Sequence, residues 1–271
     1  MITTFIIFPE THAGSILGRK ARKLRKETGR DYHTAFEQKG QSLSRRLAIS
    51  LTRPCRLLLT QPIIQLMSFY LAYNFGILYI VLSTFAALWT DHYGQSVSVS
   101  GLHYIALVTG YTIAAQGGAR VTDRVWKHLK SRANGETRPE YRVPLMIPGA
   151  IIIPIGLFWY GWTAEARAIW ILPDIGIAIF GCGIILGTQA MQAYVMDSFK
   201  TYIASASAAS QLLRSIAGFA FPLFAPSMYQ RLNYGWGNSL LAFIFIAIGI
   251  PAPLILWKFG AKLRAMGKPQ W

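Results

Sequence analysis

Long apolar stretches separated by short polar segments run along most of this chain. Each stretch approaches or exceeds the ~20 residues that a helix needs to cross about 30 Å of hydrocarbon. The stretches cover residues 61–88, 99–118, 143–162, 168–195, 201–228 and 238–257. We therefore expect an all-α membrane protein in which six transmembrane helices form one bundle over residues 61–257.

Lysine and arginine gather in alternate gaps between these stretches. Such residues hold a loop on the cytoplasmic side when a membrane protein inserts. Of the 27 Lys and Arg residues in the chain, 24 lie in four segments, which are 1–60, 119–142, 196–200 and 258–271. We therefore expect a multi-pass protein of the plasma membrane with both termini in the cytoplasm.

The positive charge of the chain follows from this topology. A formal net charge of +16 would suggest nucleic-acid binding in a soluble protein. Here 53% of the residues are hydrophobic and the mean hydropathy is +0.34, so the basicity belongs to the loops. No segment outside the stretches could build a folded basic face. We expect the lipid bilayer as the partner of these loops, and no nucleic acid.

The segment 1–60 is predicted to be a cytoplasmic linker. Leu17, Ala21 and Leu24 follow helical i, i+4, i+7 spacing among dense basic residues, which predicts a basic amphipathic helix. This helix lies either on the inner leaflet or free in solvent, and the pattern favours neither.

The rest of the linker is predicted to be less regular. Residues 28–45 are rich in Gly, Gln, Ser and charge, and are predicted as loop. The first span is predicted to open after Pro54, because proline suits the start of a helix. At the other end of the chain, residues 258–271 form a cytoplasmic tail.

Polar side chains inside the apolar stretches mark the helices that face a polar space. The first stretch has three on one helical face, the second has two tyrosines and the fourth has two amides. These candidate cavity residues are Tyr70, Tyr73, Asn74, Tyr104, Tyr111, Gln189 and Gln192. Packing explains any one tyrosine equally well, and amides also join helices by hydrogen bonds. The third and sixth stretches are almost purely apolar, so we expect them to face lipid.

Arg214 is the strongest candidate for a functional side chain. An ionisable group inside hydrocarbon costs at least about 2.5–3.5 kcal/mol, so it needs a partner or a wet cavity. Arg214 follows residue 200 by 14 positions, roughly 20 Å along a helix, too far to reach the inner interface easily. It either contacts substrate in a polar cavity or pairs with Asp174. Asp174 could also lie at the outer interface.

Enzyme motifs are absent from the sequence. It contains no GxSxG, HExxH or GxxxxGK[ST] pattern, and its His and Cys residues form no cluster of metal-ligand spacing. We expect no catalysis, no cofactor and no metal. Any pumping would then draw on an ion gradient. Asp197, at the inner end of the fourth stretch beside Lys200, is expected to make a gating or loop-fixing contact.

Short motifs recur along almost the whole chain. They are Arg138–Pro144 leading into Gly156–Trp162, Tyr194–Ser198, Ser205–Ser210 with Arg214 and Ser215, Phe221–Phe224 and Gly235–Ser239. These motifs resemble the C-terminal half of fungal multidrug transporters, in the drug:proton antiporter branch of the major facilitator superfamily. Pro9–Thr11 and Arg19–Gly29 resemble the start of that family's central cytoplasmic loop. Gly118, Asp123 and Arg124 are similar to the superfamily's loop motif.

The resemblance implies a C-terminal six-helix half of the major facilitator fold, preceded by the end of another span. Spans one, two, four and five would line a central cavity, and one half would rock against the other around a midplane site. The implied activity is efflux of small hydrophobic or cationic compounds, such as drugs, toxins or polyamine-like molecules, driven by a proton gradient. A missing N-terminal six-helix half is the implied partner. The alternative is a non-transporting half or fragment that persists in the membrane or associates with full-length relatives.

Overall fold

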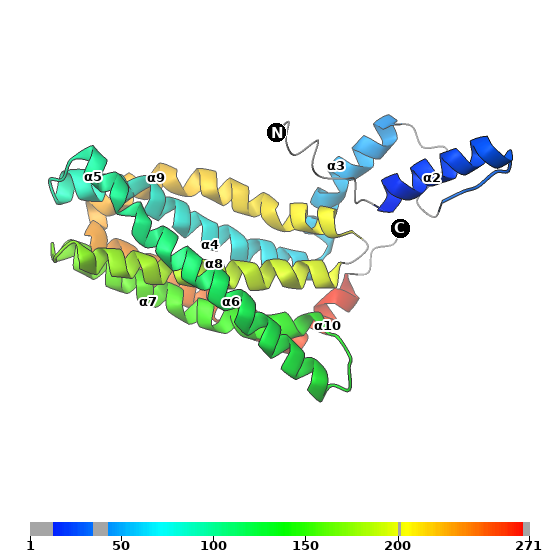
Figure 1. Cartoon of the computed structure of the whole chain (residues 1–271). Helices are drawn as coiled ribbons and strands as arrows, with labels where there is room; N and C mark the ends of the chain where they lie inside the picture. Colours follow the sequence, from blue (N-terminus) through cyan, green and yellow to red (C-terminus); the bar gives the residue numbers. More distant parts are fainter. Residues whose placement is uncertain (1–12, 35–42, 200–201, 268–271) are drawn as a thin grey trace. The chain divides into compact units, whose positions relative to one another are not determined.

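A computed structural model describes residues 13–34, 43–199 and 202–267 of the chain, and within them every regular element is a helix. The chain divides into two units, Met1–Leu51 and Thr52–Trp271. Figure 1 shows the helices in order along the chain. They are α2 (Ala13–Thr28), α3 (Leu43–Thr60), α4 (Pro62–Ala87), η1 (Leu88–His92), α5 (Val97–Leu102), α6 (Tyr104–Arg132), η2 (Pro139–Leu145), α7 (Met146–Glu165), α8 (Ile171–Ser198), α9 (Ile203–Gly249) and α10 (Pro251–Met266).

The first unit contains the predicted amphipathic helix. Helix α2 includes Leu17, Ala21 and Leu24 as expected, and it ends where Gly29 adopts a positive φ of 66°. Arg25 and Lys26 lie in its last turn, where positive charge is favourable because of the helix dipole. The predicted loop agrees with residues 29–34, and residues 35–42 lie outside the described residues. Residues 43–45 were wrongly predicted as loop, since α3 begins at Leu43.

The first long helix of the second unit begins at Pro62, next to the predicted start of the stretch at residue 61, and not directly after Pro54. Pro54 lies inside α3, and the break comes at Gln61, whose φ of −109° and ψ of 103° are extended. Proline disfavours helical backbone in the residue before it and suits the first helical position itself. Pro62 therefore ends α3 and starts α4, so the prediction that Pro54 opens the span is wrong.

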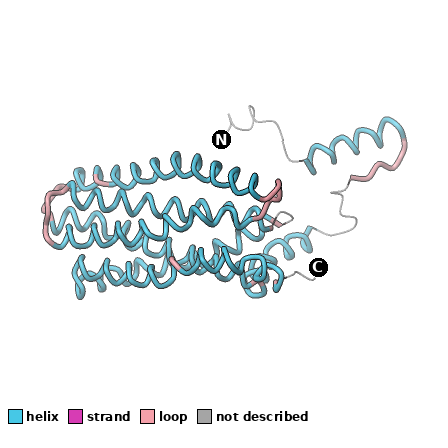
Figure 2. The backbone as a smooth tube through the Cα atoms, turned by 90° about the horizontal axis from the view of Figure 1, so that it is seen from below, coloured by secondary structure: helices cyan, strands magenta, loops and turns pink. Residues whose placement is uncertain are grey.

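Five segments of the described chain are long and apolar enough to cross a membrane. They are Pro62–His92, Val97–Arg132, Pro139–Glu165, Ile171–Ser198 and Ile203–Met266. Within the second unit these helices lie side by side along a common direction (Figure 2). The fifth segment holds both the fifth and the sixth predicted stretches.

Helix α9 contains a reversal of the chain at Asn233. As a single 47-residue helix it would be roughly 70 Å long, more than twice the hydrocarbon thickness. Asn233 breaks it with φ 54° and ψ −176°. Before the break, α9 runs parallel to α4: the hydroxyl of Ser68 donates to the carbonyl of Ala209, and Gly76 further along α4 faces the ring of Phe221.

After the break, α9 runs antiparallel to α4. The ring of Tyr70 lies beside that of Phe245, whereas Tyr73, one turn further along α4, donates a hydrogen bond of 3.0 Å to the carbonyl of Leu241. The residue numbers of the partners on α9 therefore decrease as the residue numbers on α4 increase. The two halves of α9 pass through the bundle in opposite directions, with the turn at Asn233.

The second half of α9 begins with a capped N-terminus. One oxygen of Glu165, the last residue of α7, accepts hydrogen bonds from the backbone N–H groups of Tyr234 at 2.9 Å and Gly235 at 3.2 Å. The first N–H groups of a helix have no partner within the helix. A carboxylate satisfies them and also complements the positive end of the helix dipole. Glu165 therefore fixes where the last helix starts.

Glycines let α7 and α8 approach closely. A Cβ atom on Gly149 would lie 2.9 Å from the backbone nitrogen of Gly187, and one on Gly156 would clash with the backbone of Phe180. Small residues drive close packing in lipid, where no hydrophobic force draws helices together. Gly183 and Gly187, one helical turn apart on α8, thus lie at this helix interface.

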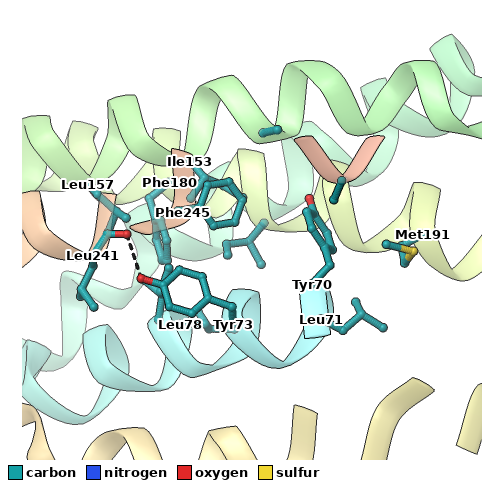
Figure 3. Packing of buried hydrophobic residues seen from close by; sticks show 14 of the residues in the cluster. Tyr70, Leu71, Tyr73, Leu78, Ile153, Leu157, Phe180, Met191, Leu241 and Phe245 are labelled. Atoms are coloured by element: carbon teal, nitrogen blue, oxygen red, sulfur yellow. Dashed lines mark hydrogen bonds between the residues drawn. The ribbon is translucent and has the colours of Figure 1, made fainter. Parts of the chain in front are cut away.

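The core of the second unit lies between α4, α7, α8 and the second half of α9. Figure 3 shows Tyr73 and Tyr70 of α4 directed toward Phe245, Ile153 and Phe180. All belong to one cluster of buried residues. The opposite side of α7 is exposed and wholly apolar, through Ile147, Ile151, Ile155, Trp159 and Trp162. Such a surface suits contact with lipid, as expected for the third stretch.

We predict that Glu165→Ala destabilises the bundle, because two helix-terminal N–H groups lose their acceptor. Loss of a helix cap costs about 0.5–2 kcal/mol, so the thermal unfolding midpoint in neutral detergent should fall by several degrees. Tryptophan fluorescence on heating measures it. Glu165→Gln is the matched control, since it keeps an acceptor oxygen and should lose less. An unchanged midpoint for Glu165→Ala would show that the cap contributes nothing.

Candidate functional site

Polar side chains of the second unit form three groups at different heights along the helices. We use outer end for the end that holds His92, Glu165 and Asn233, and inner end for the end that holds Pro62, Pro139 and Ser198, following the predicted topology. The three groups lie at the outer end, at the middle of α4 and α9, and at the inner end.

The outer group is built around His103. Its Nδ1 lies 2.7 Å from Oδ2 of Asp174 at the start of α8, and its Nε2 lies 2.8 Å from Oε1 of Gln95. The imidazole stacks on the indole of Trp89 with ring centroids 3.6 Å apart and planes 7° apart. His103, Asp174 and Trp89 are all buried. The group therefore ties the end of the first long segment to α6 and α8.

This arrangement corrects one of the predicted alternatives. Asp174 does not pair with Arg214, because its carboxylate is engaged by His103. Asp174 lies in the first turn of α8 with its side chain buried in the protein, so its place at the level of the outer interface stays a prediction. The nearby Tyr93 hydroxyl donates to the carbonyl of Ala168 at 2.9 Å. Burial, and to a lesser degree the charge of Asp174, raises the pKa of Tyr93, while Arg167 opposes this, so the phenol is a neutral donor.

The inner group joins three segments through ionic contacts. The guanidinium of Arg264 on α10 donates to Oε1 of Glu140 on η2, and to the hydroxyl of Tyr194 on α8 at 2.6 Å. Glu140 is 8% exposed, so this ion pair is largely removed from water. A Cβ on Gly260 would crowd both Tyr194 and Glu140. The end of α10 is thereby held against η2 and α8.

Asp197 makes a loop-fixing contact at the same end. Its Oδ2 accepts a hydrogen bond of 2.9 Å from Nε of Arg142, which joins α8 to η2. Lys200, the expected neighbour, lies outside the described residues. Of the loop-motif residues, Gly118 is buried against Leu186, whereas Asp123 and Arg124 are exposed on α6.

A small pocket also lies at the inner end. It has a volume of about 160 Å³ and is lined by Trp126, Thr137, Arg138, Pro139 and Asp197. Sites for drug-sized ligands measure about 300–1,000 Å³. This pocket is therefore too small for such a compound.

The candidate cavity residues divide into a buried and an accessible set. Tyr70, Tyr73 and Asn74 are 1%, 9% and 0% exposed, and they lie within the core of the second unit. Asn74 and Tyr70 both approach Gly187 of α8. These three side chains pack between helices. For the tyrosines, packing was the alternative to a place in the cavity wall that the sequence left open.

The accessible set lies on α6 and α8. Tyr104 is half-buried and donates to the carbonyl of Leu82 at 3.2 Å, while Tyr111 is half-buried beside Gly181. Gln189 is exposed and Gln192 half-buried on α8. The side chains of Tyr104 and Gln192 thus remain partly open to a ligand, although they lie on different helices.

The central group is formed by Arg214 and α4. The guanidinium carbon of Arg214 lies 3.9 Å from the ring centroid of Phe75, and its Nη1 donates to Oε1 of Gln211 at 2.9 Å. One turn further along α4, Tyr79 is 44% exposed and faces Gly218. We call Phe75, Tyr79, Gln211, Arg214 and Gly218 the central face.

Sequence reasoning found Arg214 but missed its neighbours. Gln211 lies three residues before Arg214, one helical turn away, and this spacing is visible in the sequence. Phe75 is adjacent to Asn74, but nothing in the sequence says that α4 packs beside the first half of α9. The contact depends on tertiary structure.

A bundle of long apolar helices, with charged groups at its ends and Arg214 near the middle of one helix, defines a polytopic membrane protein. The Major Facilitator Superfamily profile matches residues 4–222 of this chain. The chain belongs to this superfamily.

Several fungal transporters are similar to the chain over almost its whole length. It is 45% identical over 268 residues to an efflux pump of Penicillium aethiopicum, covering 98% of this chain and 53% of that protein. It is 46% identical over 263 residues to a probable efflux pump of Aspergillus flavus, covering 96% and 62%. An uncharacterized transporter of Schizosaccharomyces pombe is 45% identical over 261 residues, covering 96% and 53%. No solved structure matches the chain.

These comparisons confirm the family. The relatives are named as transporters and efflux pumps, so this chain is a multi-pass membrane protein of a transporter family. The chain spans about half the length of the curated relatives it matches.

We predict that Glu140→Ala lowers the stability of the bundle far more than Glu136→Ala. Removing Glu140 leaves Arg264 without its buried carboxylate, a loss of about 1–3 kcal/mol for a charged hydrogen bond. Glu136 pairs with Arg138 on the surface, where both side chains are more than 60% exposed, and such pairs contribute about 0–1 kcal/mol. Thermal unfolding in detergent compares the two, and equal midpoints would contradict the structural role of the inner group.

Proposed function

We propose that this chain forms one half of an efflux transporter for small hydrophobic or cationic compounds. The family match and the names of the relatives support export as the activity. The coverage of about half of each relative supports a second six-helix half as partner. The observation that carries the proposal is Arg214, a cation at mid-helix on an accessible face, where a lipid-facing helix would be apolar.

The central face would form the wall of the translocation path in this half. Helices α4, α6, α8 and the first half of α9 would line it, with α7 and the second half of α9 behind them. Tyr104, Tyr111, Gln189, Gln192 and Arg214 would contact substrate. The buried Tyr70, Tyr73 and Asn74 would support the wall from inside the bundle.

Alternating access requires contacts that form and break at the two ends. We assign this role at the inner end to Asp197, together with the loop-motif residues Gly118, Asp123 and Arg124. The buried position of Gly118 against α8 would set the angle at which α6 leaves the bundle.

The energy source in this proposal is proton entry, with no bound cofactor. The resemblance to drug:proton antiporters is its basis. The distribution of Lys and Arg supports cytoplasmic termini, and the proposed location is the plasma membrane.

A second candidate is a half-transporter that does not transport. It is favoured by the same coverage of about half of each relative. In this case the chain would persist in the membrane or associate with full-length relatives, using the accessible faces of α6 and α9.

We predict that inside-out vesicles with an acidic interior accumulate an aromatic dye only when this chain is combined with a second half. The second half is the N-terminal six-helix part of a full-length relative. Fluorescein and rhodamine 123 are suitable dyes, because they share a xanthene ring and differ in charge. One proton exchanged per dye molecule across one pH unit, with no membrane potential, would sustain up to about tenfold accumulation.

The same vesicles separate the two candidates. Accumulation that disappears when the pH gradient is collapsed supports the transporter. No accumulation of either dye, together with co-purification of the chain with a full-length relative, supports the non-transporting half. The chain without a second half is the control, and it should accumulate neither dye because its path lacks one wall.

A further inference from the structure

The charged residues within the apolar stretches are very few. Across the six stretches predicted from the sequence, only Asp174 and Arg214 carry a formal charge. Asp174 lies at the outer end and is engaged by His103. Arg214 is thus the single charged side chain at mid-height of the apolar stretches, and its sign is positive.

The surroundings of Arg214 contain no carboxylate. Among the described residues, no acidic oxygen lies within 4.0 Å of its guanidinium, and its side-chain partners are the amide of Gln211 and the ring of Phe75. The amide oxygen of Gln211 accepts one hydrogen bond from Arg214, whereas a guanidinium has five N–H donors in a planar fork. Several donors are therefore available to a further acceptor, and a planar anionic group matches them best.

The neighbourhood of Arg214 also provides aromatic surface. Phe75 lies under the guanidinium, and Tyr79 is exposed one turn further along α4. Gly218 of α9 packs closely against the ring of Tyr79, since a Cβ on it would lie 3.1 Å from that ring. A ligand with an aromatic ring could lie against these rings while its acidic group meets Arg214.

From this arrangement we propose that the central face selects aromatic compounds that carry an ionised acidic group, a carboxylate or a phenolate, over cationic ones. The proposal rests on the proposed transport function; it adds an acidic group to the hydrophobic substrates and excludes the cationic ones named there. A cation at this position would be repelled by the positive charge of Arg214. The described spans offer no mid-height carboxylate to offset that repulsion.

Three probes with one ring system test the charge preference directly. They are 2-naphthoate, 2-naphthylmethanol and 2-naphthylmethylammonium, and calorimetry of the full chain in neutral detergent measures their Kd. Neutral detergent replaces anionic lipid, whose headgroups could otherwise bind Arg214 in place of the probe. We predict that naphthoate binds at least about tenfold more tightly than the ammonium compound, as a charge-assisted hydrogen bond implies.

Variants of two arginines on the same helix provide the matched comparison. Arg214→Gln should abolish the preference for naphthoate over the ammonium compound, while Arg214→Lys should retain part of it. Arg231→Gln is the control, because Arg231 is an exposed residue of α9 far from the central face. Circular dichroism of each variant shows that the helices are intact.

Each outcome bears on a different claim. Three results would overturn the acidic substrate class and leave the transport proposal standing. They are equal Kd values for the three probes, tighter binding of the ammonium compound, and an Arg214→Gln variant that keeps its preference for naphthoate. Loss of the preference for naphthoate on adding the N-terminal half of a relative would also overturn the acidic substrate class, because Arg214 would then pair with that half. If no probe binds and no dye accumulates in vesicles, the transport proposal itself is wrong.

Discussion

The constraint on which this structure depends is that hydrocarbon cannot hydrogen-bond a polar group. A polar side chain or a free backbone group that meets hydrocarbon is stabilised only when the protein itself supplies a partner. The two backbone N–H groups after the break at Asn233 show this, since Glu165 of another helix accepts from both. The hydroxyl of Tyr73 shows it again, since it donates to a carbonyl of α9. These bonds determine which helices lie side by side.

Charged groups follow the same rule at the two ends of the bundle. Asp174 is paired with His103 at the outer end, and Glu140 with Arg264 at the inner end. Removal of either carboxylate would leave a cation or a donor without a partner in a poorly hydrated place. Between these ends the helices are held mainly by close contact at glycines such as Gly149 and Gly156. The ends are thus fixed by ionic contacts and the middle by packing.

Much of the fold could be predicted from the sequence, because length and hydropathy alone identify helices that span a membrane. The all-α membrane fold and the superfamily are confirmed. Helix boundaries were less predictable. Apolar residues end near 118, yet α6 continues to Arg132, because its Lys, Arg and Leu residues favour helix in water as well. Pro54 could not be distinguished from Pro62 as a helix start, since both suit the position and only tertiary packing decides.

The candidate site was predictable only in part. Arg214 was found because a cation in an apolar stretch is costly wherever it lies. Tyr73 and Asn74 have the polar composition of a cavity wall, but they are buried in the core. Their direction depends on α4 packing against a helix segment more than 160 residues later in the chain, at Leu241. No local pattern contains that information. The spacing of polar residues alone therefore could not tell whether these side chains line a cavity or lie in the core of the bundle.

The two sides of the bundle differ in what they can contact. The exposed residues of α7 are all apolar, from Ile147 to Trp162, and no polar group there would be lost to hydrocarbon. The central face has apolar neighbours too, but it also carries the guanidinium of Arg214, most of whose donors have no acceptor within the described residues. Lipid tails could cover the exposed side of α7 without loss of free energy. Covering the central face with lipid would remove the charge of Arg214 from water, which is unfavourable. The central face therefore faces water, a ligand or a second protein half, which is the property required of the wall of a transport path.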